Sequence, residues 1–137
     1  MRENMGLYRG KRTDNGEWAK GFYVHLYDHK GNESHRIYPG YAETDCGDYY
    51  PDWFEVDPET VGQYSGLDDM NEQGIFEGDI VQHMVNGKLL RGKVDYADGS
   101  FGVRIITGGA QFLCFFVDDT CEVIGNIHDN PELLEVK

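Results

Sequence analysis

The sequence is poor in leucine and alanine and has no long apolar run, which argues against long helices and a membrane span of roughly 20 residues. Its opening, MRENMGLYRGKR, lacks the apolar stretch of a signal peptide. The three cysteines, Cys46, Cys114 and Cys121, are an odd number without metal-type spacing. Since nothing here demands a disulfide, we expect a protein of a reducing cytoplasm, with no membrane contact.

Positive charge is also scarce, with 12 basic residues against 25 acidic ones and a net charge of −13. A nucleic-acid binder needs a positive surface to displace counterions from phosphates, so we expect no direct contact with nucleic acid. A compact acidic protein can instead present a phosphate-like field to a DNA-binding protein. An acidic DNA-mimic decoy is therefore one alternative function.

Turn and strand formers dominate what remains, with 18 glycines and 13% aromatic residues. Every second residue of Phe22–Tyr27 is apolar, which predicts a strand with one face in the core. The turn sequence DHKGN follows, and HRIYPG begins a second strand. This pattern predicts a β-hairpin in the first third of the chain.

Short strands and turns also fill the second half. Asp57-Pro58-Glu59 predicts a single helical turn, Asp98-Gly99 a hairpin turn, and NPELLEV a short C-terminal helix. We therefore predict a mainly β fold, with an N-terminal β-hairpin region (residues 1–62) packed on a C-terminal SH3-like small barrel (residues 63–137). Both parts are expected to form one compact unit.

Three blocks of sequence carry a family resemblance: LYRGKRTDNGEW, VDPETVGQYSGLDDMNEQGIFEGDIV and CEVIGNIHDNPELLE. In this order they resemble the YopX family, found chiefly in bacteriophages and prophages. The stretch from about His29 to Tyr50 matches no family motif. The resemblance implies a phage-associated, mostly β protein, and it lends no catalytic residues.

The acidic segment from Asp69 to Ile80 is the sharpest candidate for a metal site. Its calcium-like ligands are Asp69, Asn71, Gln73 and Glu77, at the first, third, fifth and ninth places of an EF-hand loop. The twelfth place needs a bidentate glutamate and holds Ile80. Two turns explain the segment better: one with Gly74 in a left-handed conformation, and one in which Asp79 accepts backbone N–H groups. We expect no metal.

Other chemistry has less support. His25, His29, His35, Asp45 and Cys46 supply ligand types for zinc, but no close pair such as CxxC is present. The sequence has no GxSxG elbow and no GxxxxGK[ST] phosphate loop. We therefore expect no cofactor and no enzymatic activity, although an enzyme with an unrecognised site is a second alternative.

Aromatic residues are the remaining signal. Tyrosine and tryptophan favour interfaces because one end is apolar and the other can stay wet. The interface candidates are Tyr41, Tyr49, Tyr50 and Trp53. Trp53 and Phe54 could equally fill the core. The family resemblance implies a phage or prophage accessory protein in the cytoplasm of a bacterial host cell. Together with these aromatic residues, it leads us to expect a non-catalytic β module that binds a protein partner or forms a homo-oligomer.

Overall fold

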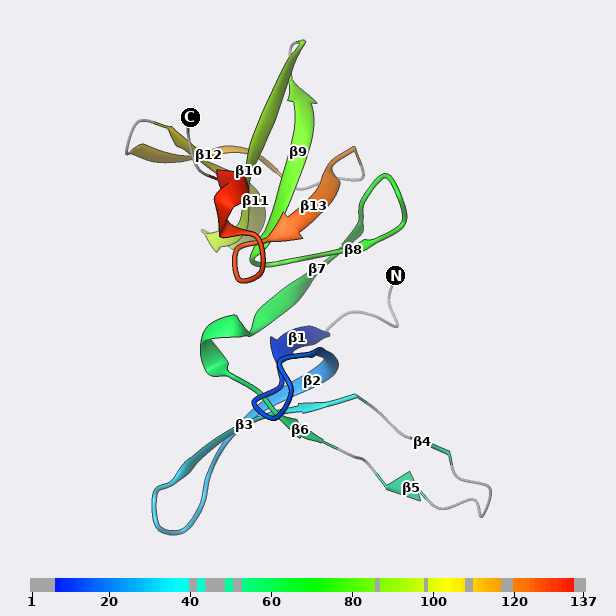
Figure 1. Ribbon diagram of the computed structural model, residues 1–137, viewed down its shortest axis with the longest axis vertical. Helices are drawn as coiled ribbons and strands as arrows, with labels where there is room; N and C mark the ends of the chain where they lie inside the picture. The colour runs from blue at the N-terminus through cyan, green and yellow to red at the C-terminus, as the bar shows by residue number, and fades with distance from the viewer. Residues whose placement is uncertain are drawn as a thin grey trace. The chain divides into compact units, whose positions relative to one another are not determined.

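The computed structural model describes residues 7–39, 42–43, 49–50, 53–85, 87–97, 99–107, 110–116 and 120–134, most of them in β-strands (Figure 1). The chain divides between Gln63 and Tyr64 into two compact units. We call them the N-terminal unit (Gly6–Gln63) and the C-terminal unit (Tyr64–Lys137). In the part of the chain described, no helix is long and apolar enough to cross a membrane.

The N-terminal unit is an antiparallel sheet. It contains β1 (Tyr8–Lys11), β2 (Trp18–Tyr27), β3 (Glu33–Tyr38), β6 (Phe54–Glu55) and the start of β7 (Gly62–Asp68), in the order β6-β3-β2-β1-β7. A separate pair joins β4 (Ala42–Glu43) to β5 (Tyr49–Tyr50). The buried core consists of Ala19, Ile37 and Val56, with Tyr8, Tyr23, Phe54 and Val61 packed against it.

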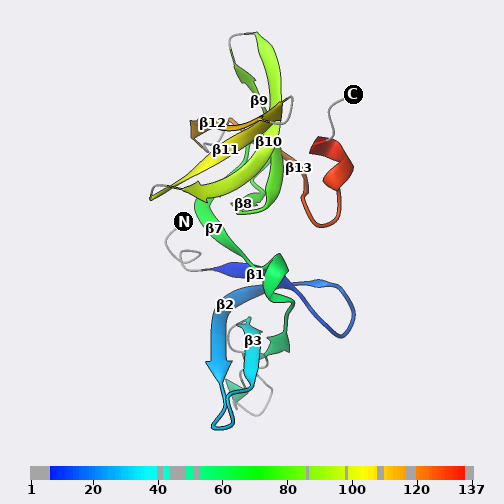
Figure 2. The same ribbon diagram turned by 90° about the vertical axis from the view of Figure 1, so that its left-hand side faces the viewer.

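β2 bends partway along its length, and its two halves have different partners (Figure 2). Its first half pairs with β1, and Phe22–Tyr27 pair with β3. Gly21 lies at the change of partner with φ +157°, and a Cβ there would come within 2.1 Å of the Tyr38 carbonyl oxygen. Only glycine fits this close approach of two backbones.

The turns that join these strands follow the predicted chemistry. Asp28 Oδ1 accepts the N–H groups of Lys30 at 2.8 Å and Asn32 at 2.9 Å, and Gly31 takes φ +85°. These contacts close the predicted hairpin between β2 and β3. Asp57 accepts the N–H of Glu59 at 3.0 Å, which caps a 3₁₀ turn at Pro58–Thr60. The single helical turn predicted there is confirmed.

The C-terminal unit contains the rest of β7 with β8 (Gly74–Phe76), and a five-stranded antiparallel sheet. That sheet has the order β12-β11-β10-β9-β13, with bounds Ala110–Phe116, Ser100–Thr107, Lys88–Ala97, Asp79–Val85 and Glu122–Asn126 respectively. Gly99, at φ +82°, lies in the predicted hairpin turn between β10 and β11. Among the described residues, its core includes Ile75, Val81, Val94, Val103, Ile105 and Cys121.

The mainly β fold is therefore confirmed, but two finer expectations are not. β12 and β13 are the outer strands of the five-stranded sheet, and within the residues described they do not pair with each other. The sheet is thus open where an SH3-like barrel would be closed. The expected C-terminal helix is a 3₁₀ turn at Pro131–Leu134. Proline starts this turn as predicted, and within the described residues the turn spans four residues.

Candidate functional site

The β2–β3 hairpin has two chemically different faces. Directly opposed residues of an antiparallel pair share a face, so the register Tyr23↔Ile37, His25↔His35 and Tyr27↔Glu33 assigns these six to one side. We call this side the histidine face. The other side is the apolar face, formed by Phe22, Val24 and Leu26 of β2 and Ser34, Arg36 and Tyr38 of β3.

The apolar face is exposed. Phe22 is 56% exposed and Leu26 36%, whereas Ile37 of the histidine face is fully buried in the core. The alternating pattern thus marks a true strand, but its apolar face is turned to solvent. Arg36 lies over the Trp53 ring, 3.8 Å from the ring centroid, and its Nε donates to Ser34 at 2.9 Å. The apolar face therefore also contains a cation that is held over an aromatic ring.

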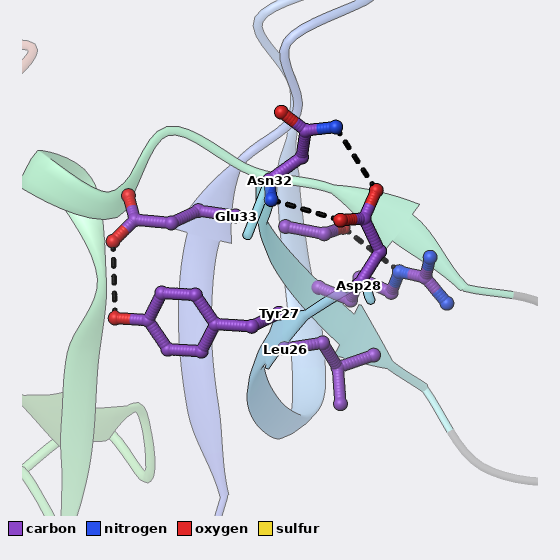
Figure 3. A pocket seen from close by; sticks show the side chains of 7 residues that line it. Leu26, Tyr27, Asp28, Asn32 and Glu33 are labelled. Carbon is purple, nitrogen blue, oxygen red and sulfur yellow. Dashed lines mark hydrogen bonds between the residues drawn. The ribbon is translucent and has the colours of Figure 1, made fainter. Parts of the chain in front are cut away.

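A pocket of about 280 Å³ lies at the tip of the hairpin (Figure 3). Its lining residues are Leu26, Tyr27, Asp28, Asn32, Glu33, Ser34 and Arg36. The Asp28 carboxylate accepts hydrogen bonds from Asn32, and the largest effect on its pKa, the bond from the Asn32 backbone N–H, lowers that pKa. Asp28 therefore stays ionised and shapes the turn.

The histidine face gathers two imidazoles around a carboxylate. The His25 and His35 rings stack with centroids 4.1 Å apart. Glu33 Oε1 lies 3.5 Å from His25 Nε2, and Glu33 Oε2 lies 3.9 Å from His35 Nε2. One ligand atom from each of these three side chains lies within 4.8 Å of the other two.

Two tyrosines complete the histidine face. The Tyr23 hydroxyl is hydrogen-bonded to His35 Nδ1 at 2.6 Å, and the Tyr27 hydroxyl donates to Glu33 Oε1 at 3.1 Å. Partial burial, then the negative charge of Glu33, raise the pKa of Tyr23. Its hydrogen bond to Glu33 raises the pKa of Tyr27. Both phenols therefore stay protonated at neutral pH.

The outer edge of β2 carries backbone groups that point away from β3. Val56 donates its N–H to the His35 carbonyl at 2.9 Å, so the His35 backbone groups point away from β2. Its cross-strand partner His25 must likewise point its N–H and C=O away from β3. Within the described ranges no strand pairs with Phe22–Tyr27 on that side.

The predicted interface aromatics fall only partly within the described chain. Tyr41 lies outside it. Tyr49 and Tyr50 form β5, but their side chains also lie outside the described part. Trp53 is 43% exposed beneath Arg36, whereas its neighbour Phe54 packs against the core. Of the two alternatives considered for this pair, surface or core, Trp53 therefore takes the surface and Phe54 the core.

The calcium-like residues form a turn that satisfies its own backbone. Asp69 is 4% exposed, and its Oδ1 accepts the N–H groups of Asn71 and Gln73, each at 2.8 Å. The Asn71 side chain donates to Glu122 at 3.3 Å, and Glu77 lies in the turn between β8 and β9. Asp69 thus binds the backbone of its own loop, and the Asn71 side chain contacts β13.

The left-handed residue of this loop differs from the expectation. Glu72 has φ +65°, whereas Gly74 begins β8. Gly74 is closely packed instead, since a Cβ there would lie 3.2 Å from the Tyr64 ring. The second turn is as predicted, with Gly78 at φ +93° and Asp79 Oδ2 accepting the Phe76 N–H at 2.8 Å.

Sequence reasoning considered His25, His29 and His35 together as zinc ligands. The hairpin unites His25 with His35 and leaves His29 in the turn. Asp45 and Cys46 lie outside the described residues, and Cys121 is a buried thiol in the core. Glu33 went unnoticed, although counting outward from the turn pairs it with Tyr27 beside the two histidines.

Comparisons with known proteins agree over nearly the whole chain. A family model described as YopX protein matches residues 7–135, which confirms the resemblance seen in the three sequence blocks. The chain is also similar to the crystal structure of protein EF1440 from Enterococcus faecalis, at 26% identity and a TM-score of 0.55. That match covers 96% of this chain and 99% of that chain. No curated protein matches the chain.

Proposed function

The chain belongs to the YopX family, and from this premise we propose that it is a non-catalytic protein-binding β module, a phage or prophage accessory protein acting in the bacterial cytoplasm. Neither the family's description nor that of the similar crystal structure names a reaction or a ligand. The proposal therefore depends on the geometry of the β2–β3 hairpin.

One observation carries the proposal: an exposed apolar strip lies beside a strand edge that no described strand covers. Phe22 and Leu26 are 56% and 36% exposed on the strand whose outer edge has no partner among the described strands. Open edges invite pairing by another chain, and exposed apolar side chains add to its affinity. This combination supports β-augmentation, in which a partner strand extends the sheet.

The charge of the chain indicates which kind of partner is favoured. At a net charge of −13, two copies repel each other, while a segment carrying lysine or arginine is attracted. We therefore favour a separate protein with a basic, extended segment over a homo-oligomer. Self-association through the same edge is the competing outcome of the test below.

The pocket at the hairpin tip supports a binding role over a catalytic one. Its Asp28 carboxylate holds the turn, and the hydrogen bond from Asn32 lowers its pKa, which makes it a poor general acid near neutral pH. Glu33 is hydrogen-bonded to Tyr27. The charged groups in this pocket thus organise the hairpin.

Capture from phage-infected host cells tests the proposal when the wild-type protein is compared with a Phe22→Lys/Leu26→Lys double variant. The wild type is expected to retain a specific protein that the double variant loses, because two charges on the apolar face oppose docking. Leu89→Lys is the matched control, since Leu89 is also 56% exposed but lies on β10 of the C-terminal unit. Circular dichroism checks that all three proteins are folded.

Light scattering of the purified protein separates the two kinds of partner. A monomeric wild type supports a separate partner. A dimer that the double variant abolishes and Leu89→Lys preserves would assign the edge to self-association. Equal capture by the wild type and the double variant would refute the assignment of binding to this hairpin.

A further inference from the structure

The histidine face of the hairpin contains a set of metal ligands that the proposed function does not use. We propose that it binds a divalent transition-metal ion of the Zn²⁺ class through His25 Nε2, His35 Nε2 and a carboxylate oxygen of Glu33. Two imidazoles and one carboxylate, with a fourth position open, form an established zinc ligand set. The proposal is independent of the proposed function.

The distances lie close to those of a bound ion. Tetrahedral zinc with bonds of about 2.0–2.1 Å separates neighbouring ligand atoms by roughly 3.3 Å. Glu33 Oε1 lies 3.5 Å from His25 Nε2, and Oε2 lies 3.9 Å from His35 Nε2. One ligand atom from each of the three side chains lies within 4.8 Å of the other two, so rotations about side-chain bonds are needed to bring all three onto one ion.

The strand register holds the two imidazoles together. His35 directs its carbonyl to Val56, so His25 and His35 form a pair without hydrogen bonds between their own backbones. In such pairs the Cα atoms are only about 4.5 Å apart and the side chains are closest. The stacked rings, with centroids 4.1 Å apart, reflect this geometry. The hairpin thus orders two ligands before any ion arrives.

Tyr23 fixes which nitrogen of His35 faces the cluster. The Tyr23 hydroxyl lies 2.6 Å from Nδ1, and its oxygen accepts the proton of that nitrogen when Nε2 binds a metal. Protein metal sites commonly orient a ligating histidine by such a hydrogen bond on its second nitrogen. Tyr27 similarly donates to Glu33 Oε1 and orients the carboxylate.

The three ligand side chains are exposed to solvent to different extents, and their exposed side leaves a fourth coordination position free. The His35 side chain is 16% exposed, that of His25 37% and that of Glu33 55%. The deepest ligand is thus the one held by Tyr23, and the solvent side of the cluster is open. A water molecule or a side chain of another protein can take the remaining coordination position.

Calorimetric titration of the tag-free protein with Zn²⁺, after removal of metal by a chelator, tests the site. We expect one ion per chain at micromolar affinity, and visible absorption bands of a tetrahedral complex when Co²⁺ replaces Zn²⁺. His25→Gln and His35→Gln should abolish stoichiometric binding. His29→Gln is the matched control, because His29 lies in the turn of the same hairpin and should bind as the wild type does.

Tyr23→Phe distinguishes an organised site from histidines that merely lie near each other. It leaves all three ligands in place and removes the hydrogen bond to His35 Nδ1. We expect roughly a 10- to 100-fold loss of metal affinity. Binding should also weaken on acidification, because ligating imidazoles must be neutral.

The proposal fails if the wild type binds less than one ion per chain at micromolar Zn²⁺, or if His29→Gln lowers the affinity as much as His25→Gln. If His35→Gln does not fold, the more exposed His25 still decides the matter. These titrations use the purified chain alone, so loss of the metal site and failure of partner capture are distinguishable.

Discussion

Asp69 Oδ2 accepts the backbone N–H of Val123 at 2.9 Å and so joins a turn to strand β13, 54 residues further along the chain. Its other oxygen accepts two N–H groups within the turn, from Asn71 and Gln73. One buried carboxylate thus satisfies three backbone donors. The segment that resembled a calcium loop is a hydrogen-bonded anchor for the C-terminal unit.

Replacing Asp69 with alanine should destabilise the C-terminal unit by about 3 kcal/mol, because three backbone N–H groups lose a charged acceptor. Asp69→Asn keeps one acceptor oxygen and should cost about half as much. Both tryptophans, Trp18 and Trp53, lie in the N-terminal unit, so urea unfolding should be followed by circular dichroism. Asp14→Ala, at an exposed pair with Arg12, should leave the transition unchanged.

The turns were the part of the fold that local chemistry predicted best. Asp28, Asp57 and Asp79 accept N–H groups within four residues of themselves, so their roles depend on neighbouring sequence alone. The Val123 bond to Asp69 could not be predicted in this way, since it needs the arrangement of distant strands. Barrel closure is not confirmed among the described strands, and it likewise depends on distant parts of the chain, the outer strands β12 and β13.

The histidine cluster could be predicted only in part from the local sequence. Its pairing follows from the length of the turn: with Asp28 and Asn32 at the two ends, counting outward gives Tyr27 with Glu33 and then His25 with His35. The sequence analysis instead grouped both histidines with His29, Asp45 and Cys46 and did not include Glu33. The aspect that no local pattern revealed is the exposure of Phe22 and Leu26, because alternation does not say which face is buried.

The raised pKa of Tyr64 predicts that the folded protein loses stability in alkaline solution. Its side chain is buried and donates a hydrogen bond to Asp68 at 2.6 Å, and burial first, then this bond, raise its pKa to about 12. The unfolded chain has the ordinary tyrosine pKa of about 10. The folded state therefore binds the proton more tightly, so the Tyr64 contribution is fully present below about pH 10 and is lost as pH rises toward 12.

Urea midpoints measured from pH 8 upward should reveal this loss in the wild type, with a shallower decline in Tyr64→Phe. The difference between the two curves isolates Tyr64 from the other tyrosines. Parallel curves for the two proteins would show that Tyr64 ionises equally easily in the folded and unfolded chain.

Gly21→Ala should destabilise the N-terminal unit by about 2–3 kcal/mol, because the added Cβ would lie 2.1 Å from the Tyr38 carbonyl oxygen and 2.7 Å from Pro39 Cα. Both obstacles are backbone atoms and cannot rotate away. Tryptophan fluorescence during urea unfolding measures the change. Gly16→Ala serves as the control: Gly16 has φ +75° but nothing within 4 Å, so only the backbone strain of about 1 kcal/mol remains.

Trp53 and Phe54 should separate binding from folding. Phe54 packs against the core and lies beneath Arg12, 4.0 Å from the ring centroid, so Phe54→Ala should cost about 2 kcal/mol of stability. Trp53 is 43% exposed and contacts Arg36 by a cation–π interaction worth about 0.5–1 kcal/mol. Trp53→Ala should therefore keep the fold, which circular dichroism melting measures, yet weaken capture of the partner, since exposed tryptophans beside apolar strips dominate interfaces. Unchanged capture by Trp53→Ala would restrict the docking surface to the outer edge of β2 and to the exposed apolar residues of that strand, Phe22 and Leu26.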